Sequence, residues 1–282
     1  MSRLDVRKTY KLYIDGEFPR SESGRTFPAL DSRGEVLARV ALASRKDLRE
    51  AVRAARAAQG KWAERSGYNR GQILYRIAEM MEDRRATFDE QIRSGGSSAA
   101  RARAEMDNSI DRMVWYAGWA DKFPQVYGNL NPVAGPFFNI SAPEPTGVVG
   151  IIPPSVPSLF GLVSRLAPVI VSGNTAVVLA SETQPMPAIT LAEALESSDV
   201  PPGVVNILTG RQSELAPWLA DHMDVNAIDL AGAEDGIRVR IEQGAVHNVK
   251  RLVGTDGNLD GQSPYLIAAF TETKTVWHPK GL

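Results

Sequence analysis

The second half of the chain alternates short apolar runs with segments of helical apolar spacing, and this alternation limits the possible folds more than any other feature. The runs are short and continuous, as in strands that are covered on both faces. The expected strands are 148–152, 176–179, 204–208 and 227–230, and the expected helices are 158–172, 188–197, 213–222 and one that begins at 236. Strands that alternate with helices of this length predict an α/β fold with a doubly wound parallel sheet.

The first half of the chain predicts a few extended pieces followed by long helices. Residues 12–16 indicate a hairpin, and residues 36–40 alternate like a strand. Ser44 stands three residues before Asp47, a capping-box pattern that opens a helix ending near Lys61. Apolar residues at helical spacing predict two more helices, at about 69–91 and about 101–122.

Between these halves, residues 128–150 are dense in proline and glycine. They interrupt two short apolar runs, Phe137–Ile140 and Val148–Ile152. Because proline cannot donate a ladder hydrogen bond, such a segment suits edge strands or connections. We therefore expect an extended arm at 131–146 that leaves the domain.

Composition excludes several classes of protein and site. Lys plus Arg is 32 and Asp plus Glu is 33, and this near-neutral charge of -1 argues against a nucleic-acid partner. No run approaches ~18 apolar residues, so we expect no membrane contact and a cytoplasmic location. The 282 residues contain no cysteine, which excludes disulfides and thiol nucleophiles within them. The three histidines lack the spacing of metal ligands, and we expect no metal.

The usual phosphate-binding signatures, G-x-x-x-x-G-K-[ST] and G-x-G-x-x-G, are absent from the sequence. One turn, Leu230–Gly236, joins an expected strand to an expected helix through small residues that would let a ligand approach the backbone. However, Glu234 and Asp235 lie at the start of that helix, where they satisfy its dipole themselves and would repel a pyrophosphate. The turn is equally consistent with a nucleotide contact and with an acidic helix cap.

Several segments, in order over nearly the whole chain, resemble the aldehyde dehydrogenase family. They are 36–62, 116–122, 144–153, 168–178 and 199–210. The resemblance implies a Rossmann-like cofactor-binding domain made of residues 1–130 and 147–270, with a protruding oligomerisation arm at 131–146. It also implies that 271–282 is a tail where the family's catalytic domain would begin.

The catalytic positions that the resemblance implies are altered. The family follows Ile-Pro with Trp-Asn, whose amide stabilises the oxyanion, but here Ile152-Pro153 is followed by Pro154 and Ser155. Loss of one such donor typically costs about 10²–10³ in rate. Asn258 stands where the family has its general-base glutamate, and no cysteine follows it. We therefore expect Ser155 and Asn258 to be degenerate positions and the chain to be catalytically inactive.

The cofactor positions implied by the resemblance are also altered. The family's turn with a lysine and a glutamate that hold the adenosine ribose has lost the lysine, whereas Glu182 is retained. The family's phosphate turn reads Leu230–Glu234 here, without its hydroxyls. NAD or NADP is possible, but neither is firmly expected. The candidate cofactor-binding residues are Ile152, Pro153, Glu182, Gly210, Gly232 and Ala233.

Three functional hypotheses follow. The first is a structural or regulatory subunit that pairs, through the arm at 131–146, with a full-length aldehyde dehydrogenase subunit or with itself, since strand addition is a common mode of recognition. The surface left bare by a missing catalytic domain would also need cover. The second is a weak NAD(P)-binding module without turnover, and the third is a subunit of an active aldehyde:NAD(P) oxidoreductase complex.

Overall fold

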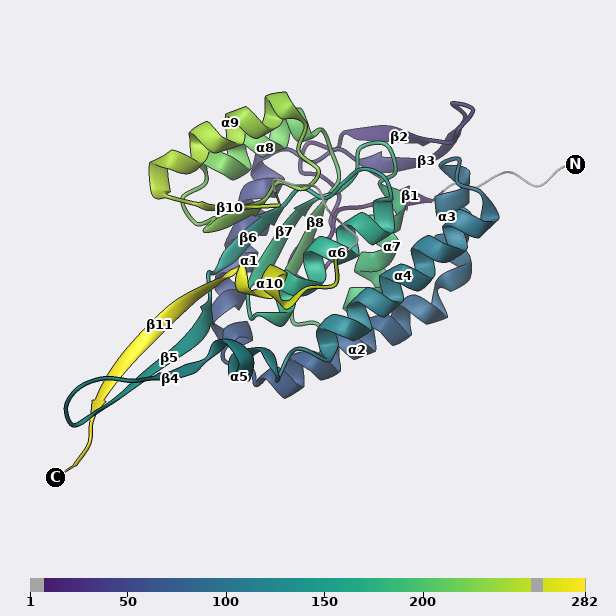
Figure 1. The fold of residues 1–282 in the computed structure, drawn as a ribbon. Helices are drawn as coiled ribbons and strands as arrows, with labels where there is room; N and C mark the ends of the chain where they lie inside the picture. Colours follow the sequence, from purple (N-terminus) through teal and green to yellow (C-terminus); the bar gives the residue numbers. More distant parts are fainter. Residues whose placement is uncertain (1–7, 255–260, 282) are drawn as a thin grey trace, which may run out of the picture.

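The computed structural model describes residues 8–254 and 261–281, which form an α/β body with a small N-terminal sheet and a projecting arm (Figure 1). The strands are β1 (Thr9–Tyr10), β2 (Thr26–Leu30), β3 (Val36–Ala41), β4 (Asn129–Asn131), β5 (Phe137–Pro145), β6 (Val148–Ile151), β7 (Thr175–Leu179), β8 (Val205–Leu208), β9 (Ala227–Asp229), β10 (Arg251–Val253) and β11 (Thr271–Pro279). The helices are α1 (Arg45–Ala63), α2 (Gly67–Asp83), α3 (Arg85–Ser94), α4 (Ala99–Ala117), α5 (Phe123–Tyr127), α6 (Ser158–Val171), α7 (Met186–Glu196), α8 (Gln212–Asp221), α9 (Asp235–Ala245) and α10 (Pro264–Ala268).

The central sheet confirms the predicted fold class. Its five strands are all parallel, in the order β10-β9-β6-β7-β8, so the chain winds outward from β6 in one direction and then in the other. The strands β6 to β9 are fully buried, as their continuous apolar sequences predict. Strand order reverses between β6 and β9, and the carboxyl ends at such a reversal are where open α/β sheets bind ligands.

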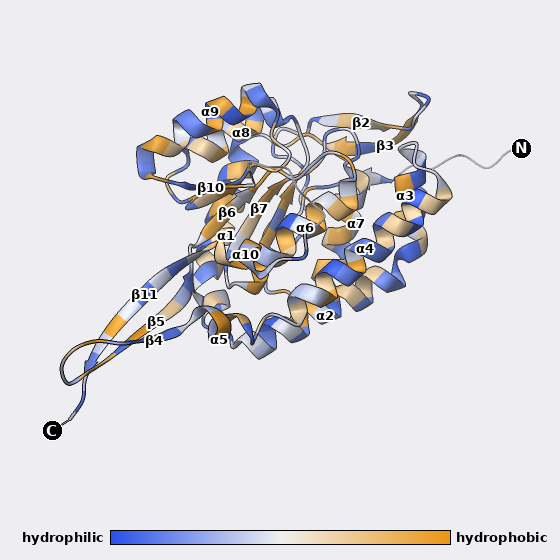
Figure 2. Cartoon of the chain, in the orientation of Figure 1, coloured by the Kyte–Doolittle hydropathy of each residue, from blue (hydrophilic) through white to orange (hydrophobic). Residues whose placement is uncertain are grey.

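Two hydrophobic clusters lie on opposite faces of this sheet. One joins the sheet to α1, α8 and α9, and the other joins it to α6 and α7 and to the outer helices α2, α3 and α4. Figure 2 shows the apolar strands between these helical layers. The carboxyl edge of the sheet is therefore held rigidly by packing from both sides.

Of the three helices predicted in the first half, the first is confirmed as α1, and the other two end earlier than predicted. The capping box at α1 is confirmed, since Asp47 N donates to Ser44 Oγ (3.3 Å) and Ser44 N donates to Asp47 Oδ2 (2.8 Å). The predicted helix 69–91 is instead two helices, α2 and α3, separated at Arg84. The guanidinium of Arg84 donates to Met80 O (3.2 Å) and to Ser197 Oγ (3.1 Å), and so stabilises the break without any glycine or proline. In place of the predicted helix 101–122, α4 ends at Ala117, and the short helix α5 follows from Phe123.

The arm is present as predicted, but it includes a strand that the sequence did not predict. Three antiparallel strands, in the order β11-β5-β4, project from the body (Figure 1). Within the segment 271–282, predicted as a tail, Thr271–Pro279 form β11, which pairs with β5 from Thr271↔Pro145 to Pro279↔Phe137. This correction has a physical reason, because β11 is rich in threonine, valine and tryptophan, which favour strands.

The prolines of the arm lie where no hydrogen-bond donor is needed. Thr146 N donates to Phe270 O (3.2 Å) and Lys280 N donates to Pro136 O (2.7 Å), so the even-numbered residues of β11 bond to β5. Pro279 therefore faces the free outer edge of β11. On β5, Pro143 and Pro145 face the β4 side of the strand. They lie beyond the last pair with β4, Asn129↔Ser141, so no strand is bonded to them there. These three prolines therefore do not remove a hydrogen bond between the strands of the arm.

Candidate functional site

The six predicted cofactor-binding residues meet at the carboxyl edge of the central sheet. Ile152 and Pro153 follow β6, and Glu182 follows β7. The other three follow the next two strands, Gly210 after β8 and Gly232 and Ala233 after β9. The fold brings these residues together because the carboxyl ends of parallel strands share one edge, and their role as cofactor ligands stays a prediction.

The turn after β9 is closed by its own hydrogen bonds. Gly232 N donates to Ile152 O (2.8 Å), Ala233 N donates to Leu230 O (3.0 Å), and Ala231 N donates to Asp229 Oδ1 (3.0 Å). A Cβ added to Gly232 would lie 2.1 Å from the carbonyl oxygen of Pro153, so the two loops are in direct backbone contact. Each of these three amides already has a partner in the protein, so none of them is left to donate to a phosphate.

Three helix N-termini at the same edge, those of α6, α8 and α9, carry carboxylates of the chain itself. Glu105, from α4, accepts from Leu159 N (2.8 Å) and Phe160 N (3.4 Å) at the start of α6. Burial raises the pKa of Glu105, and these backbone hydrogen bonds oppose the increase. Glu182 accepts from Gln212 N at the start of α8. Because Glu234 and Asp235 also lie at the start of α9, negative charge already occupies all three positions.

The loops after β6 and β7 are tied together next to the predicted catalytic position. Ser181 Oγ donates to Ser155 O (3.2 Å) and accepts from Gln184 N (3.1 Å). Ser155 is partly buried there. The second predicted catalytic position, Asn258, lies outside the described residues.

A buried ion pair fills the crevice between β9 and α6, and sequence reasoning missed it. Arg165 Nε and Nη2 lie 2.7 and 2.6 Å from Asp229 Oδ2, with the two side chains only 1% and 0% exposed. Gly254, after β10, packs directly on the pair, since a Cβ there would lie 2.5 Å from Arg165 Nη2. The available signal was a single arginine in an apolar helix and a single aspartate ending an apolar strand, because buried charges need a partner.

The residues at the carboxyl edge do not fit the dinucleotide, NAD or NADP, that the family resemblance implies. Its pyrophosphate needs free amides and a positive helix end, whereas the amides of the turn after β9 have partners and the N-termini of α6, α8 and α9 face carboxylates. Gly210 is a packing position, since a Cβ there would lie 3.2 Å from Leu215 and 3.3 Å from Ala43 N. We therefore derive no chemical step that involves a nicotinamide cofactor.

The arm has two unlike faces. On one, Asn131 Nδ2 donates to Asn139 Oδ1 (2.6 Å) and Ser141 Oγ (2.7 Å), and Ser141 Oγ lies 2.8 Å from Thr275 Oγ1. The other face carries the Lys274–Glu144 ion pair (2.9 Å) and a group of exposed apolar side chains. The apolar arm face is this group, which consists of Leu130, Phe138, Ile140 and Val276, and they are 67%, 44%, 48% and 50% exposed.

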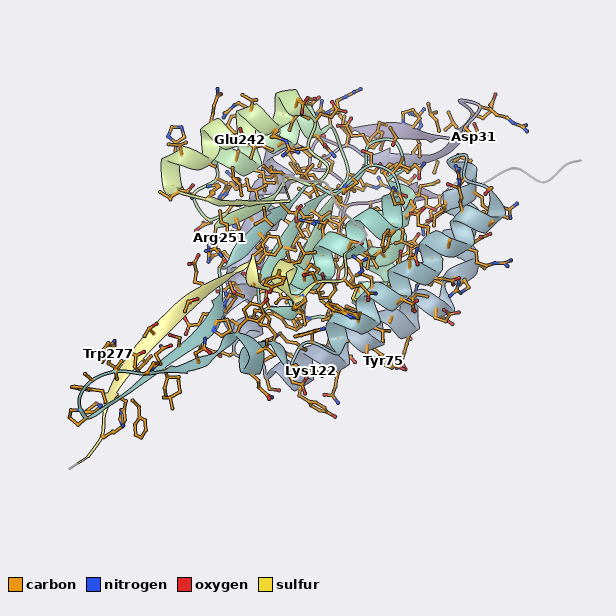
Figure 3. The ribbon with its side chains drawn as sticks, in the orientation of Figure 1. Asp31, Tyr75, Lys122, Glu242, Arg251 and Trp277 are labelled. Atoms are coloured by element: carbon orange, nitrogen blue, oxygen red, sulfur yellow. The ribbon has the colours of Figure 1, made fainter. Side chains whose placement is uncertain are left out.

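The root of the arm is fixed to the body. Arg251 of β10 donates to Ala269 O (3.2 Å) and pairs with Glu272 of β11 (2.8 Å). Asn174 Nδ2 donates to Phe270 O (2.7 Å), next to the start of β11. Figure 3 shows Arg251 at this root and Trp277 far out on the arm. The apolar arm face is therefore held at a fixed position away from the core.

The chain matches the model of the aldehyde dehydrogenase family over residues 19–277. It is 33% identical over 259 residues to "Aldehyde dehydrogenase, cytosolic 1" of Elephantulus edwardii, a match that covers 89% of this chain and 51% of that protein. It is also 33% identical to "Retinal dehydrogenase 2" of Gallus gallus, over 94% of this chain and 51% of that protein. The chain therefore spans about half the length of these relatives.

Solved structures agree with this match. HpcC from Thermus thermophilus superposes with a TM-score of 0.82 at 31% identity, over 87% of this chain and 47% of that one. The NAD+ complex of an aldehyde dehydrogenase from Bacillus cereus superposes with a TM-score of 0.81 at 26% identity, over 87% and 50%. The fold and its carboxyl-edge site are those of a Rossmann-like α/β protein. More particularly, the chain belongs to the aldehyde dehydrogenase family.

Among the helices of residues 8–254 and 261–281, none combines the length and the apolarity that crossing a membrane requires.

Proposed function

We propose that this chain is a non-catalytic member of the aldehyde dehydrogenase family that acts as a structural or regulatory subunit and attaches through its arm to a full-length aldehyde dehydrogenase subunit. The observation that carries this proposal is the free outer edge of β11, on a rigid arm whose apolar face is exposed. In this proposal, residues 1–130 and 147–270 form one cofactor-type domain that supports the arm, and the protein is cytoplasmic.

The non-catalytic part of the proposal is supported by what the described residues and the composition offer. No cysteine occurs in the 282 residues, so an aldehyde has no thiol to attack it here. The carboxyl edge, where a nicotinamide cofactor would lie, is closed by the turn after β9 and by the Arg165–Asp229 pair. In a complex with a full-length subunit, the thiol and the cofactor would come from that subunit.

The attachment is proposed to be strand addition. Since the even-numbered residues of β11 bond to β5, the backbone N–H groups of Thr273, Thr275 and Trp277 point outward. An extended strand of the partner would pair with them through main-chain hydrogen bonds. The apolar arm face would then be covered by the partner's side chains, which exposed patches of this kind usually require.

Two variants at one position test this attachment. Thr275→Pro removes one outward N–H, whereas Thr275→Ala removes the same hydroxyl and keeps the N–H. Each chain is mixed with a full-length aldehyde dehydrogenase from the same organism, and complexes are detected by size-exclusion chromatography with light scattering. We expect the natural chain and Thr275→Ala to form a complex. We expect Thr275→Pro to lose it, while circular dichroism shows both variants folded.

A second change keeps every backbone donor and tests the apolar arm face. Val276→Lys places a charge on that face, and we expect it to weaken the complex as well. A chain that stays monomeric with its full-length relative would contradict the proposal. A self-oligomer in place of the mixed complex would overturn the choice of partner.

A further inference from the structure

The outer face of the N-terminal sheet, in the order β1-β3-β2, contains a hollow of about 230 Å³ that the proposed function does not use. Four cationic side chains line it, and none of its lining residues is acidic. The four are Lys11, Arg20, Arg25 and Arg39, all exposed, and two threonine hydroxyls, Thr9 and Thr26, lie among them.

The backbone fixes these cations around the hollow. Arg39 lies in the central strand β3 between buried Ala38 and Val40, so alternation places its side chain on the outer face. Leu12 N donates to Pro19 O (3.0 Å), which brings the neighbouring residues Lys11 and Arg20 together.

The backbone of the fourth cation, Arg25, is tied to the N-terminal sheet as well. Leu42 N donates to Arg25 O (3.0 Å), which ties the start of β2 to the end of β3. The cluster therefore belongs to the fold and does not depend on chance side-chain positions.

The positive charge of the hollow is not neutralised within the part of the chain that the structure describes, where none of the four cations forms an ion pair. The neighbouring acids are already engaged. Asp47, only 6% exposed, accepts from Ser21 Oγ (2.8 Å) and Ser44 N (2.8 Å), and Glu22 pairs with Lys46 (3.2 Å). Like charges held together in this way repel one another, and a bound anion would relieve that repulsion.

We propose that this hollow binds the phosphate groups of a small polyanion. Arginine presents a planar fork of donors that matches phosphate oxygens in pairs, and three of the four cations are arginines. The volume lies below the range of about 300–1,000 Å³ typical of drug-sized ligands, which favours a short chain of phosphates with little else attached. The site is separate from the arm, and its lining residue Ala41 accepts from Thr209 Oγ1 (2.7 Å) at the carboxyl end of β8.

Isothermal titration calorimetry of the natural chain with tripolyphosphate, at low and at physiological ionic strength, tests this site. We expect binding at one site per chain that weakens with salt. Arg39→Gln and Arg20→Gln should each reduce the affinity about tenfold or more, since each removes charged hydrogen bonds. Inorganic phosphate, tested in parallel, should bind more weakly because it engages fewer of the cations.

Arg103→Gln is the matched control. It removes the same charge from an exposed position on α4, outside the hollow, and should leave the affinity unchanged. No heat of binding with the natural chain would overturn the proposal. An equal loss in Arg103→Gln would also overturn it, because general charge attraction would then explain the binding. Either failure leaves the arm proposal untouched, since that is measured with a protein partner.

Discussion

At the scale of single residues, a few residues close the carboxyl edge of the central sheet. Gly232 lets the turn after β9 lie directly on Pro153, and Asp229 and Arg165 fill the space behind it. Glu182, predicted from the family resemblance to hold a ribose, accepts from Gln212 N at the start of α8. Many polar groups at this edge thus have partners within the chain, whereas Ser158 Oγ and Gln212 Nε2 are buried there without a partner among the described residues.

Two glycine-to-alanine changes, one in the turn after β9 and one at the start of α9, test the closed turn. We expect Gly232→Ala to lower the free energy of unfolding by about 1–3 kcal/mol, because its Cβ would meet Pro153 O at 2.1 Å and the loops must separate. Gly236→Ala, in the first turn of α9, meets nothing within 4 Å and should raise it by about 0.5–1 kcal/mol. Urea unfolding followed by circular dichroism measures both. Equal stability of the two variants would show that the loops are not in contact.

At the scale of elements, the sequence predicts the strands and helices that follow from local patterns of apolar residues. It does not predict contacts between residues that lie far apart in the sequence. The strands β6 to β9 were predictable because each is a continuous apolar run between helical segments. Likewise, the edge that collects the site residues follows from parallel pairing alone. The strand β11 was missed because its partner, β5, lies far away in the sequence. For the same reason the Arg165–Asp229 pair was missed, since no local spacing links a helix to a distant strand end.

The register of β11 predicts an alternating pattern of amide hydrogen exchange along that strand. Lys274 and Val276 should exchange slowly, because their N–H groups bond to β5, whereas Thr275 and Trp277 should exchange fast in the isolated chain. Hydrogen exchange followed by NMR resolves each amide. In the proposed complex, the two fast amides should become protected. Uniform exchange along the strand in the isolated chain would contradict the register that the attachment requires.

At the scale of the whole molecule, the chain combines a complete parallel sheet with a rigid arm. The carboxyl edge of the sheet is closed by internal hydrogen bonds, so its stability does not depend on a ligand there. The arm, in contrast, exposes backbone donors and an apolar face that nothing in the described residues covers. The arm, with its exposed backbone donors and apolar side chains, is therefore the part of the molecule that favours binding to a partner.

The same division predicts how the chain responds to dinucleotides. A ligand that binds only the folded state stabilises it by RT ln(1 + [L]/Kd), which is about 2.7 kcal/mol at a hundredfold excess over Kd. Because the amides and helix ends at the carboxyl edge are already occupied, we expect NAD and NADP to leave the unfolding temperature unchanged in a thermal scan. The Bacillus cereus aldehyde dehydrogenase, whose structure holds NAD+, should shift under the same conditions. A rise that grows with NAD or NADP concentration would mean that the edge opens for the ligand, and the weak NAD(P)-binding alternative would then replace the structural role.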